Sequence, residues 1–312
     1  LNLDWDHCDH YKNLDSLKRT FAALVQRTAR YTLIEEDTLA SLSEHLSEST
    51  LSCSDGGSGK FQFVDCIHGS VSKQSSLVKG VLSNSQFNKS NRAFALALLE
   101  AFQGELPAVK NVFDDFAGVD RRQQQLFSNE RLTVIEDYAH HPREIAVILQ
   151  SIEAVFPDST LTLVFQPHRF SRTEALCKDF IRVLAQVEHL YLLPVYSAFE
   201  TGARGSDSVD LIHHFTESSA RALSLDGRGL QTVSDEVCER GALGHQVLLF
   251  LGAGSINEFA HAFCANFQNE DSARAWLQYT RKKVSSQCLL KLDEPLASKT
   301  TFKIGGAARH YA

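Results

Sequence analysis

The fold is decided by the stretch Glu136-Asp137-Tyr138-Ala139-His140-His141-Pro142-Arg143-Glu144-Ile145. Residues 131–135 before it form a short apolar and β-branched segment that predicts a buried strand. Apolar residues at helical spacing follow it, up to Phe156. Pro142 suits the first turn of a helix, where its missing N–H costs nothing. The stretch is therefore predicted to be a strand-to-helix turn, and ligands of α/β sheets bind at such turns.

The same turn also allows a purely structural interpretation. Asp137 would then cap the following helix, and His140 and His141 would be exposed side chains without a chemical role. The pattern of this one turn gives the structural and the functional interpretation about even weight. Other turns of the chain are needed to choose between them.

Length and composition restrict the class of protein. The chain has 312 residues, enough for two ordinary domains, and its 43% hydrophobic and 22% charged residues indicate a globular protein. A net charge of -7 gives no basic footprint for nucleic acid. No apolar run is long enough for a membrane span, and no signal peptide opens the sequence. The seven cysteines form no Cys-x-x-Cys pair, so we predict reduced thiols and a cytoplasmic protein.

The ends of the sequence lie inside patterned segments. The chain contains no methionine, opens on Leu1 and stops at Ala312. We therefore expect it to be a fragment of a longer reading frame.

From about residue 131, strand and helix patterns alternate regularly. Strands are predicted over 131–136, 161–165, 190–193 and 247–251, and helical segments over 143–155, 173–186, 207–223 and from Ile256 onward. This alternation predicts an α/β fold with a doubly wound, mostly parallel sheet.

Polar clusters follow each of these four strands. They are Asp137 with His140, residues 166–172, Tyr196 with Glu200, and Gly252 to Ser255. Carboxyl ends of parallel strands share one edge, so we expect these clusters to line one binding crevice. Gly252-Ala253-Gly254 alone is a weak nucleotide signal, because Asn257 stands where a dinucleotide fingerprint needs a small residue. A tight turn onto a helix N-terminus still suits an anion.

The first third of the chain carries weaker signals. A helix is predicted after Asn13, with Leu14, Leu17, Phe21, Leu24 and Val25 on one face. Before it, Asp6, His7, Asp9 and His10 combine carboxylate and imidazole, which can hold a divalent metal, although sequential residues point in different directions. Residues 52–60 end in Gly59-Lys60, but Ser54 and Phe61 break the phosphate-loop pattern, so we predict a turn into a strand over 61–64.

Asparagines and arginines follow further along. Asn88 and Asn91 stand at the start of a helix predicted to end near Phe102, where asparagine is usually a cap. Arg121 and Arg122 form a pair that can clamp phosphate, although such pairs are more often a solvated surface.

Together these blocks resemble the Mur ligase family. The segments 137–142 and 165–173 carry the resemblance most strongly, and 6–11, 88–91, 116–122, 196–200 and 252–256 agree with it. The match covers roughly residues 1–268, in the family's order. It implies part of a central ATPase domain over 1–129, a C-terminal domain over 130–268 and a linker over 269–288.

The resemblance implies ATP-dependent joining of an amino acid to a carboxylate of a UDP-sugar in peptidoglycan synthesis. Within the family, Gln166-Pro167-His168-Arg169 favours the branch that adds L-alanine to UDP-N-acetylmuramate, through an acyl phosphate. The cofactors implied are ATP and Mg²⁺. By their match to the family, the candidate catalytic residues are His140, His168, Arg169 and Arg172, the candidate nucleotide-binding residues are Asn88, Asn91, Arg122 and Asp137, and the candidate metal ligand is His7.

Departures from the family pattern leave alternatives open. Phe87 stands where the family usually has histidine, and Gln123, Phe199 and Ser255 also differ. The family's phosphate-binding loop would precede Leu1, so we expect residues 1–312 alone not to catalyse ligation. One alternative is a non-catalytic module that binds nucleotide or a partner, and another is a murein tripeptide recycling ligase, which shares the histidine-rich turn.

Residues 289–312 resemble a second family, the UDP-N-acetylenolpyruvoylglucosamine reductases. Thr300 to Ala308 fits the Thr-Thr-x-x-x-Gly-Gly-x-Ala segment that opens their FAD-binding domain. This resemblance implies a natural fusion of ligase and reductase, in which only a complete reductase domain binds FAD.

Overall fold

The computed structural model describes residues 3–7, 10–28, 32–34, 36–47, 61–63, 91, 95, 118–200, 208–215, 220–241, 244–267, 291–295 and 307–311. Its largest part is a six-stranded sheet with the strand order β3–β4–β8–β5–β6–β7. The strands are β3 (Gln124–Ser128), β4 (Leu132–Asp137), β5 (Thr160–Phe165), β6 (His189–Leu192), β7 (Arg221–Ala222) and β8 (Gln246–Leu251).

Neighbouring strands of this sheet pair in parallel, except that the edge strand β3 pairs antiparallel with β4. All six residues of β4 and of β8 are buried, as expected for central strands of a parallel sheet that is covered on both faces. The predicted α/β class is confirmed.

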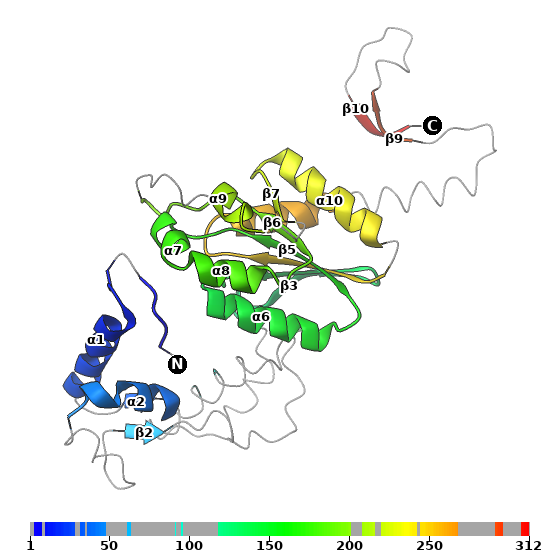
Figure 1. Cartoon of the computed structure of the whole chain (residues 1–312). Helices are drawn as coiled ribbons and strands as arrows, with labels where there is room; N and C mark the ends of the chain where they lie inside the picture. Colours follow the sequence, from blue (N-terminus) through cyan, green and yellow to red (C-terminus); the bar gives the residue numbers. More distant parts are fainter. Residues whose placement is uncertain are drawn as a thin grey trace, which may run out of the picture.

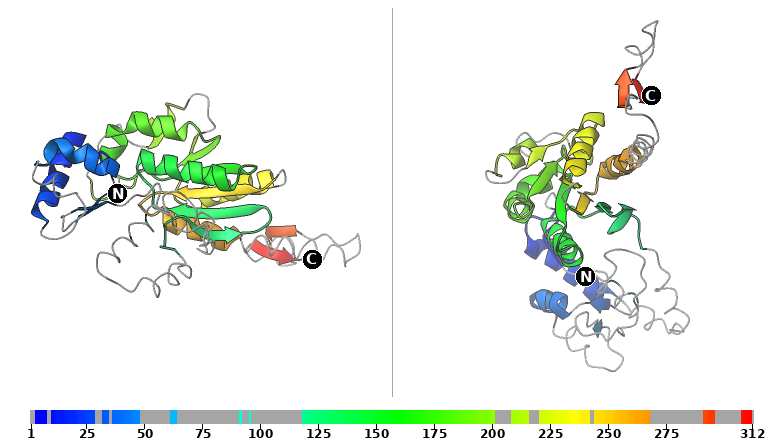
Figure 2. Two further views of the ribbon diagram at one scale, coloured as in Figure 1. Left: turned by 90° about the horizontal axis from the view of Figure 1, so that it is seen from below. Right: turned by 90° about the vertical axis from the view of Figure 1, so that its right-hand side faces the viewer.

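Helices cover both faces of the sheet (Figures 1 and 2). One face packs against α6 (Pro142–Val155), α8 (Cys177–Leu184) and α9 (Ser208–Ile212), and the other against α10 (Gly227–Gly241) and the helix over residues 256–267. Side chains of β8 alternate between the two layers: Val247, Leu249 and Leu251 join the first, and Leu248 and Phe250 join the second. The doubly wound arrangement therefore follows from strands that are apolar on both sides.

The turn that decided the prediction forms as expected. β4 ends at Asp137, and α6 begins with Pro142. The cap of α6 is His141, not Asp137: its side chain accepts a hydrogen bond from the backbone N–H of Arg143, while Glu144 accepts from the backbone N–H of His141. This reciprocal arrangement is a capping box, with histidine in the place where serine or threonine is usual. The structural interpretation of Asp137 as the cap is wrong.

Other boundaries differ from the predictions. The single helix predicted over 173–186 is two helices, α7 (Phe170–Ala175) and α8, because Leu176 leaves the helical region with φ -107° and ψ 16°. Within the helical segment predicted over 207–223, the described residues form the helix α9 and, at 221–222, the short strand β7. The first strand of the sheet, β3, begins at Gln124 and was not predicted.

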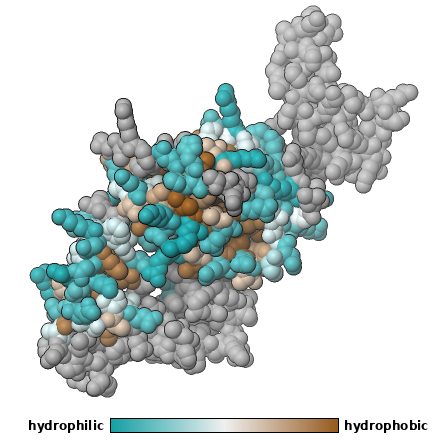
Figure 3. All heavy atoms as spheres, in the orientation of Figure 1, coloured by the Kyte–Doolittle hydropathy of each residue, from teal (hydrophilic) through white to brown (hydrophobic). Residues whose placement is uncertain are grey.

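The N-terminal residues build a separate small core. Its elements are α1 (Leu14–Arg27), β1 (Thr32–Ile34), α2 (Glu36–Leu42), the 3-10 helix η1 (Ser43–His45) and β2 (Phe61–Phe63), which pairs in parallel with β1. Asn13 caps α1 as predicted. The predicted apolar face is partly wrong: Leu17 and Val25 are buried together with Ala22, whereas Leu14, Phe21 and Leu24 are exposed. In Figure 3 the apolar side chains of the described residues form small patches among hydrophilic ones.

Some predicted segments lie outside the described residues, namely the loop over 52–60, Phe87, Asn88 and the linker over 269–288. Near the C-terminus, β9 (Lys291–Pro295) and β10 (Ala307–Tyr311) pair antiparallel. In the part of the chain that is described, no helix is long and apolar enough to cross a membrane, and Cys177 and Cys264 are free thiols.

The layer between sheet and α8 gives a stability prediction. Phe180 is 0% exposed and packs against Phe165, so Phe180→Ala should lower the free energy of unfolding by about 3–5 kcal/mol. Phe199 is 100% exposed, so Phe199→Ala should change it by less than about 0.5 kcal/mol. Urea denaturation of both variants measures the two values. Equal losses would contradict the packing described.

Candidate active site

Four turns meet at the carboxyl edge of the sheet, as the sequence predicted. The strand ends are level, because Asp137 of β4 pairs with Leu251 of β8, Leu251 with Phe165 of β5, and Phe165 with Leu192 of β6. Backbone hydrogen bonds continue across the turns, from Gly252 N to Asp137 O at 3.1 Å and from Tyr196 N to Pro167 O at 2.8 Å. The side chains of the four turns are therefore held at fixed distances from one another.

Asp137 anchors the first turn from inside. One carboxylate oxygen accepts from the backbone N–H of Gln123 at 2.8 Å and the other from that of Ala139 at 2.7 Å. Burial raises the pKa of Asp137 to about 6 against the lowering effect of these two hydrogen bonds. The side chain is 4% exposed, so in this structure it fixes two backbone segments.

Two arginines lie beside the ring of Tyr138. The guanidinium carbon of Arg121 is 4.9 Å from the ring centroid and that of Arg122 is 5.8 Å away. Arg121 donates to the backbone oxygens of Gly252 and Gly254, at 2.8 and 3.1 Å, and so ties its own turn to the last one. Arg122 is exposed, so its charge is accessible to an anion.

A hydrogen bond fixes which ring nitrogen of neutral His140 carries the proton. Its Nδ1 is 2.9 Å from the backbone oxygen of Tyr138, which can only accept, so Nδ1 carries the proton. Burial lowers the pKa of His140, although Glu144 opposes the shift. A neutral His140 therefore has its lone pair on Nε2.

The ring centroid of His168 lies 5.6 Å from that of His140. In His168 the protonated and unprotonated ring nitrogens are the reverse of those in His140. The Nδ1 of His168 lies 3.1 Å from Nη1 of Arg172, and a guanidinium can only donate, so Nδ1 is the acceptor. Burial, reinforced by the charges of His140, Arg172 and Arg169 against that of Asp6, lowers the pKa of His168 to about 4. At neutral pH the ring therefore carries its one proton on Nε2. Its other neighbour is Tyr196, whose ring stacks on it at 5.4 Å.

An unusual backbone conformation and several hydrogen bonds fix the position of Arg169 and of the start of α7. Arg169 has φ 71°, a left-handed conformation that non-glycine residues seldom adopt. Its N–H donates to the backbone oxygen of Tyr196 at 2.8 Å. Two residues later, both the N–H and the hydroxyl of Ser171 donate to the carboxylate of Glu200. These bonds join α7 to the turn after β6.

The last turn is packed against Gln166 without spare room. The side-chain oxygen of Gln166 accepts from the backbone N–H of Ile256 at 3.0 Å, at the start of the helix over 256–267. Gly252 has φ 153°, and a Cβ on Gly254 would lie 2.6 Å from both Gln166 Oε1 and Tyr196 Cγ. Glycine at both positions is therefore required by geometry.

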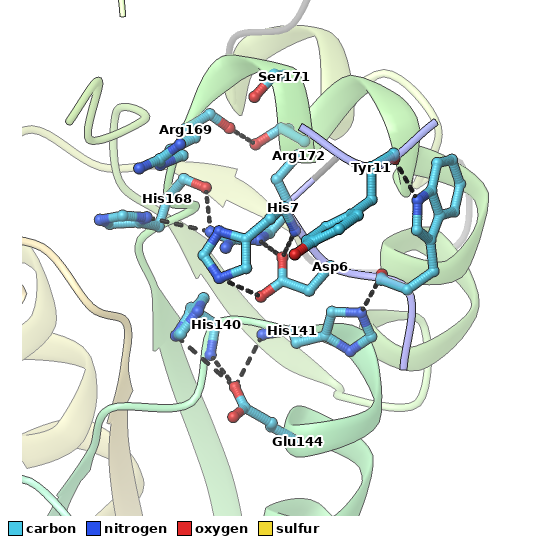
Figure 4. Close-up of polar contacts among 12 residues, drawn as sticks. Asp6, His7, Tyr11, His140, His141, Glu144, His168, Arg169, Ser171 and Arg172 are labelled. Atoms are coloured by element: carbon cyan, nitrogen blue, oxygen red, sulfur yellow. Dashed lines mark hydrogen bonds and ion pairs between the residues drawn. The ribbon is translucent and has the colours of Figure 1, made fainter. Parts of the chain in front are cut away.

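The N-terminal segment 3–7 reaches this edge from the other end of the sequence (Figure 4). Asp6 Oδ1 accepts from Nε of Arg172 at 2.8 Å, and the backbone oxygen of Trp5 is 3.2 Å from Nε2 of His141. Burial alone would raise the pKa of Asp6, but the hydrogen bond and charge of Arg172 and the backbone N–H of His7 lower it to about 2. From sequence, Asp6 is predicted only as a metal donor, because a contact between residues 166 positions apart leaves no local pattern.

The predicted metal ligand His7 is largely exposed, and its ring is 4.0 Å from the carboxylate of Asp6. Asp6 is already paired with Arg172. Among the described residues no three His, Cys, Asp or Glu side chains come together as a metal site. The described residues therefore supply one imidazole nitrogen, which fits a magnesium ion only if phosphates and water provide most of its ligands. Of the predicted nucleotide residues, Asn91 is helical and exposed, while Asn88 lies outside the described part.

Comparison with known proteins finds one matching family and relatives that share a name. Residues 121–254 match the family described as Mur ligase, glutamate ligase domain. The chain is 28% identical over 284 residues to UDP-N-acetylmuramate–L-alanine ligase of Coxiella burnetii, covering 85% of this chain and 61% of that protein. It is 29% identical over 281 residues to the ligase of the same name from Acidithiobacillus ferrooxidans, covering 83% and 59%. These matches support the Mur ligase family.

The solved structure of MurF from Acinetobacter baumannii shares the fold, with a TM-score of 0.51, 12% identity, and coverage of 86% of this chain and 58% of that one. The chain spans about three fifths of the length of the curated relatives it matches. The family match begins at Arg121 and ends at Gly254, and these two residues are hydrogen-bonded to each other at the sheet edge.

The last turn gives a matched test of the site. Gly254→Ala should displace Gln166 and Tyr196, and with Tyr196 the ring of His168 that stacks on it, because the added Cβ would lie 2.6 Å from their atoms. Gly244→Ala is the control, since a Cβ there meets nothing within 4 Å. We expect a lower unfolding midpoint and an altered His168 ring signal in NMR for Gly254→Ala only. Unchanged spectra of both variants would contradict the packing.

The lowered pKa of His168 predicts how its contribution to stability depends on pH. Between about 4 and the ordinary value of 6.5 the unfolded chain binds the proton and the folded chain does not. The stabilising contribution is therefore complete above pH 6.5 and is lost as the pH falls towards 4. Urea midpoints measured across this range should fall less steeply for His168→Gln than for the wild type. Parallel curves would show that His168 titrates normally.

Proposed function

We propose that this chain belongs to an ATP-dependent ligase that joins L-alanine to UDP-N-acetylmuramate in peptidoglycan synthesis, in the cytoplasm. The relatives of that name, at 28% and 29% identity, support the substrate pair. The observation that carries the proposal is the meeting of His140, His168 and Arg172 at the carboxyl edge of the sheet, where the charge of Arg169 also acts on His168. Neutral imidazoles beside fixed cations suit a reaction whose intermediates are anionic.

The proposed reaction has two steps, phosphorylation of the carboxylate and attack of the amine on the acyl phosphate. A carboxylate oxygen of the UDP-sugar attacks the γ-phosphorus of ATP, the bond to the β-phosphate breaks, and ADP leaves. The amine of L-alanine then attacks the carbonyl carbon of the acyl phosphate. The carbon–oxygen bond to phosphate breaks, inorganic phosphate leaves, and the nitrogen loses a proton.

The two histidines suit different parts of the second step. The Nε2 lone pair of His140 is the group able to take the proton from the attacking nitrogen. The Nε2–H of His168 is the group able to donate a hydrogen bond to the oxygen on which negative charge develops. Arg169 adds positive charge beside them, as the attraction of acyl phosphate and carboxylate requires.

The described residues that could contact ATP and its magnesium ion are Arg122, Asp137 and His7. Arg122 is exposed beside Tyr138 and is available to a phosphate. Asp137, predicted to bind the ribose, has each carboxylate oxygen hydrogen-bonded to backbone, so such a contact would use a second lone pair. Magnesium enters as the ion that ATP carries, with His7 as the one described donor, and it neutralises phosphate charge when bound.

For residues 289–312 the proposal is a reductase segment fused to the ligase. Its support is the match of Thr300 to Ala308 in sequence alone. The product of the whole reading frame should then bind FAD, which is seen as yellow protein with flavin absorbance. Colourless protein that takes up no added FAD would remove the fusion and leave the ligase proposal untouched.

The ligase is tested by ADP release from the product of the whole reading frame. We expect release that requires both UDP-N-acetylmuramate and L-alanine, and its loss in His168→Ala and Arg169→Ala with unchanged circular dichroism. Release that instead requires the murein tripeptide would assign the recycling reaction. No release from folded protein with magnesium and ATP would indicate a non-catalytic module.

A further inference from the structure

Arg172 is the most enclosed cation of the site. Its side chain is 4% exposed, and its hydrogen bonds go to protein groups. Nε donates to Asp6, and Nη1 donates to both the ring Nδ1 and the backbone oxygen of His168, at 3.1 and 3.0 Å. A guanidinium buried in this way is poorly placed to bind a substrate carboxylate, unlike the less buried Arg169. It is well placed to hold His168.

Asp6 is held in position by its own segment. The backbone oxygen of His7, which has φ 51°, accepts from the N–H groups of His10 and Tyr11 at 2.8 and 2.9 Å, which closes a tight turn. Trp5 donates from Nε1 to the backbone oxygen of Tyr11 at 2.8 Å, and its ring packs against the core layer of α6 and α8. His141, the cap of α6, contacts the backbone oxygen of Trp5. The carboxylate of Asp6 therefore reaches Arg172 from a fixed frame.

The three side chains form a chain of direct contacts. Asp6 fixes the direction of the guanidinium plane through Nε, and a planar guanidinium then fixes where Nη1 points. Nη1 points at Nδ1 of His168 and excludes a proton from it. The proton of His168 is thereby confined to Nε2, the nitrogen that the proposed function needs as a donor.

From these contacts we infer that Asp6 and Arg172 are positioning residues that set the tautomer of His168, so that a residue from the start of the chain controls which hydrogen-bonding group the site presents. The inference deepens the proposed function and rests on it for the role of the Nε2–H. The tautomer itself is a property of the protein without substrate. It can be measured whether or not the ligase activity is found.

The chain offers a matched control for Asp6. Asp4, two residues earlier, forms an ion pair with Arg143 of α6. This second pair joins the same two parts of the chain, but Arg143 is 67% exposed and makes no contact with His168 among those described. Losing Asp4 removes a carboxylate from the same segment while leaving the contacts of Arg172 in place.

The test is NMR of the full chain labelled with nitrogen-15 in histidine, where the couplings of ring nitrogens to ring hydrogens distinguish the two tautomers. The signals of His168 are those missing from His168→Gln. We expect protonation of Nε2 alone in the wild type and in Asp4→Ala, and a mixture of both tautomers in Asp6→Ala. Should Asp6→Ala not fold, Asp6→Asn keeps the size of the side chain and should give the same change with smaller amplitude.

Kinetics of the whole reading frame give the second readout. We expect Asp6→Ala to lower kcat about 10²-fold with little change in the KM for ATP, since a displaced reacting group costs about that much. Asp4→Ala should stay within about twofold, because its partner Arg143 is 67% exposed and such pairs contribute little, while the contacts of Arg172 remain.

Three results would overturn the inference. The first is a wild-type His168 protonated on Nδ1, and the second is an unchanged tautomer in both Asp6 variants. The third is a loss of activity in Asp6→Ala with the tautomer intact, because Asp6 would then act through another contact. Absence of ligation by the wild type would refute the proposed function alone, and the tautomer measurement would still decide the role of Asp6.

Discussion

The register of β8 between β4 and β5 is the constraint on which the rest of the structure depends. Asp137, Leu251, Phe165 and Leu192 end their strands in one row, and each of the four turns starts directly after that row. A slip of one residue would turn every side chain of a strand to the opposite face. Because both faces of β8 are packed by separate apolar layers, such a slip would expose or displace a buried side chain at each position. The apolar strands thus fix the polar edge.

The electrostatics of the site follow from that fixed edge. His140 and His168 are brought together in partly buried positions beside arginines, so protonation of either ring is disfavoured. Two neutral imidazoles with opposite tautomers offer an acceptor and a donor a short distance apart, which would suit the proposed acyl transfer. The assignment of each proton comes from a partner with a single role, the Tyr138 carbonyl for one ring and the Arg172 guanidinium for the other.

Much of the fold could be predicted from sequence, because its signals are local. The strands β4, β5 and β8 are largely continuous apolar runs, and α6 has apolar residues at helical spacing. Each of these elements lies within one or two residues of its prediction. The failures have physical reasons. The edge strand β3 has no buried residue, both residues of β7 are exposed, and neither strand has an apolar run to predict it. The helix α10 was not predicted because its sequence is largely polar. The break between α7 and α8 at Leu176 contains no proline or glycine from which it could be predicted.

The part of the candidate site that has local sequence signals could also be predicted. Residues that follow strands, such as His140 and His168, could be placed at one edge from topology alone. The role of Asp6 could not, because it depends on a contact between residues 166 positions apart. His141 was likewise hidden, since histidine is an unusual cap and its pairing with Glu144 is recognisable only with the backbone in view.

The most direct test of the central claim follows the oxygen atoms of the substrate. UDP-N-acetylmuramate labelled with oxygen-18 in its carboxylate would be turned over with ATP and L-alanine by the product of the whole reading frame. Formation of an acyl phosphate predicts that each inorganic phosphate released carries one labelled oxygen, with the other retained in the new amide. Unlabelled phosphate alongside amide formation would contradict the account, because the carboxylate would then never have been phosphorylated.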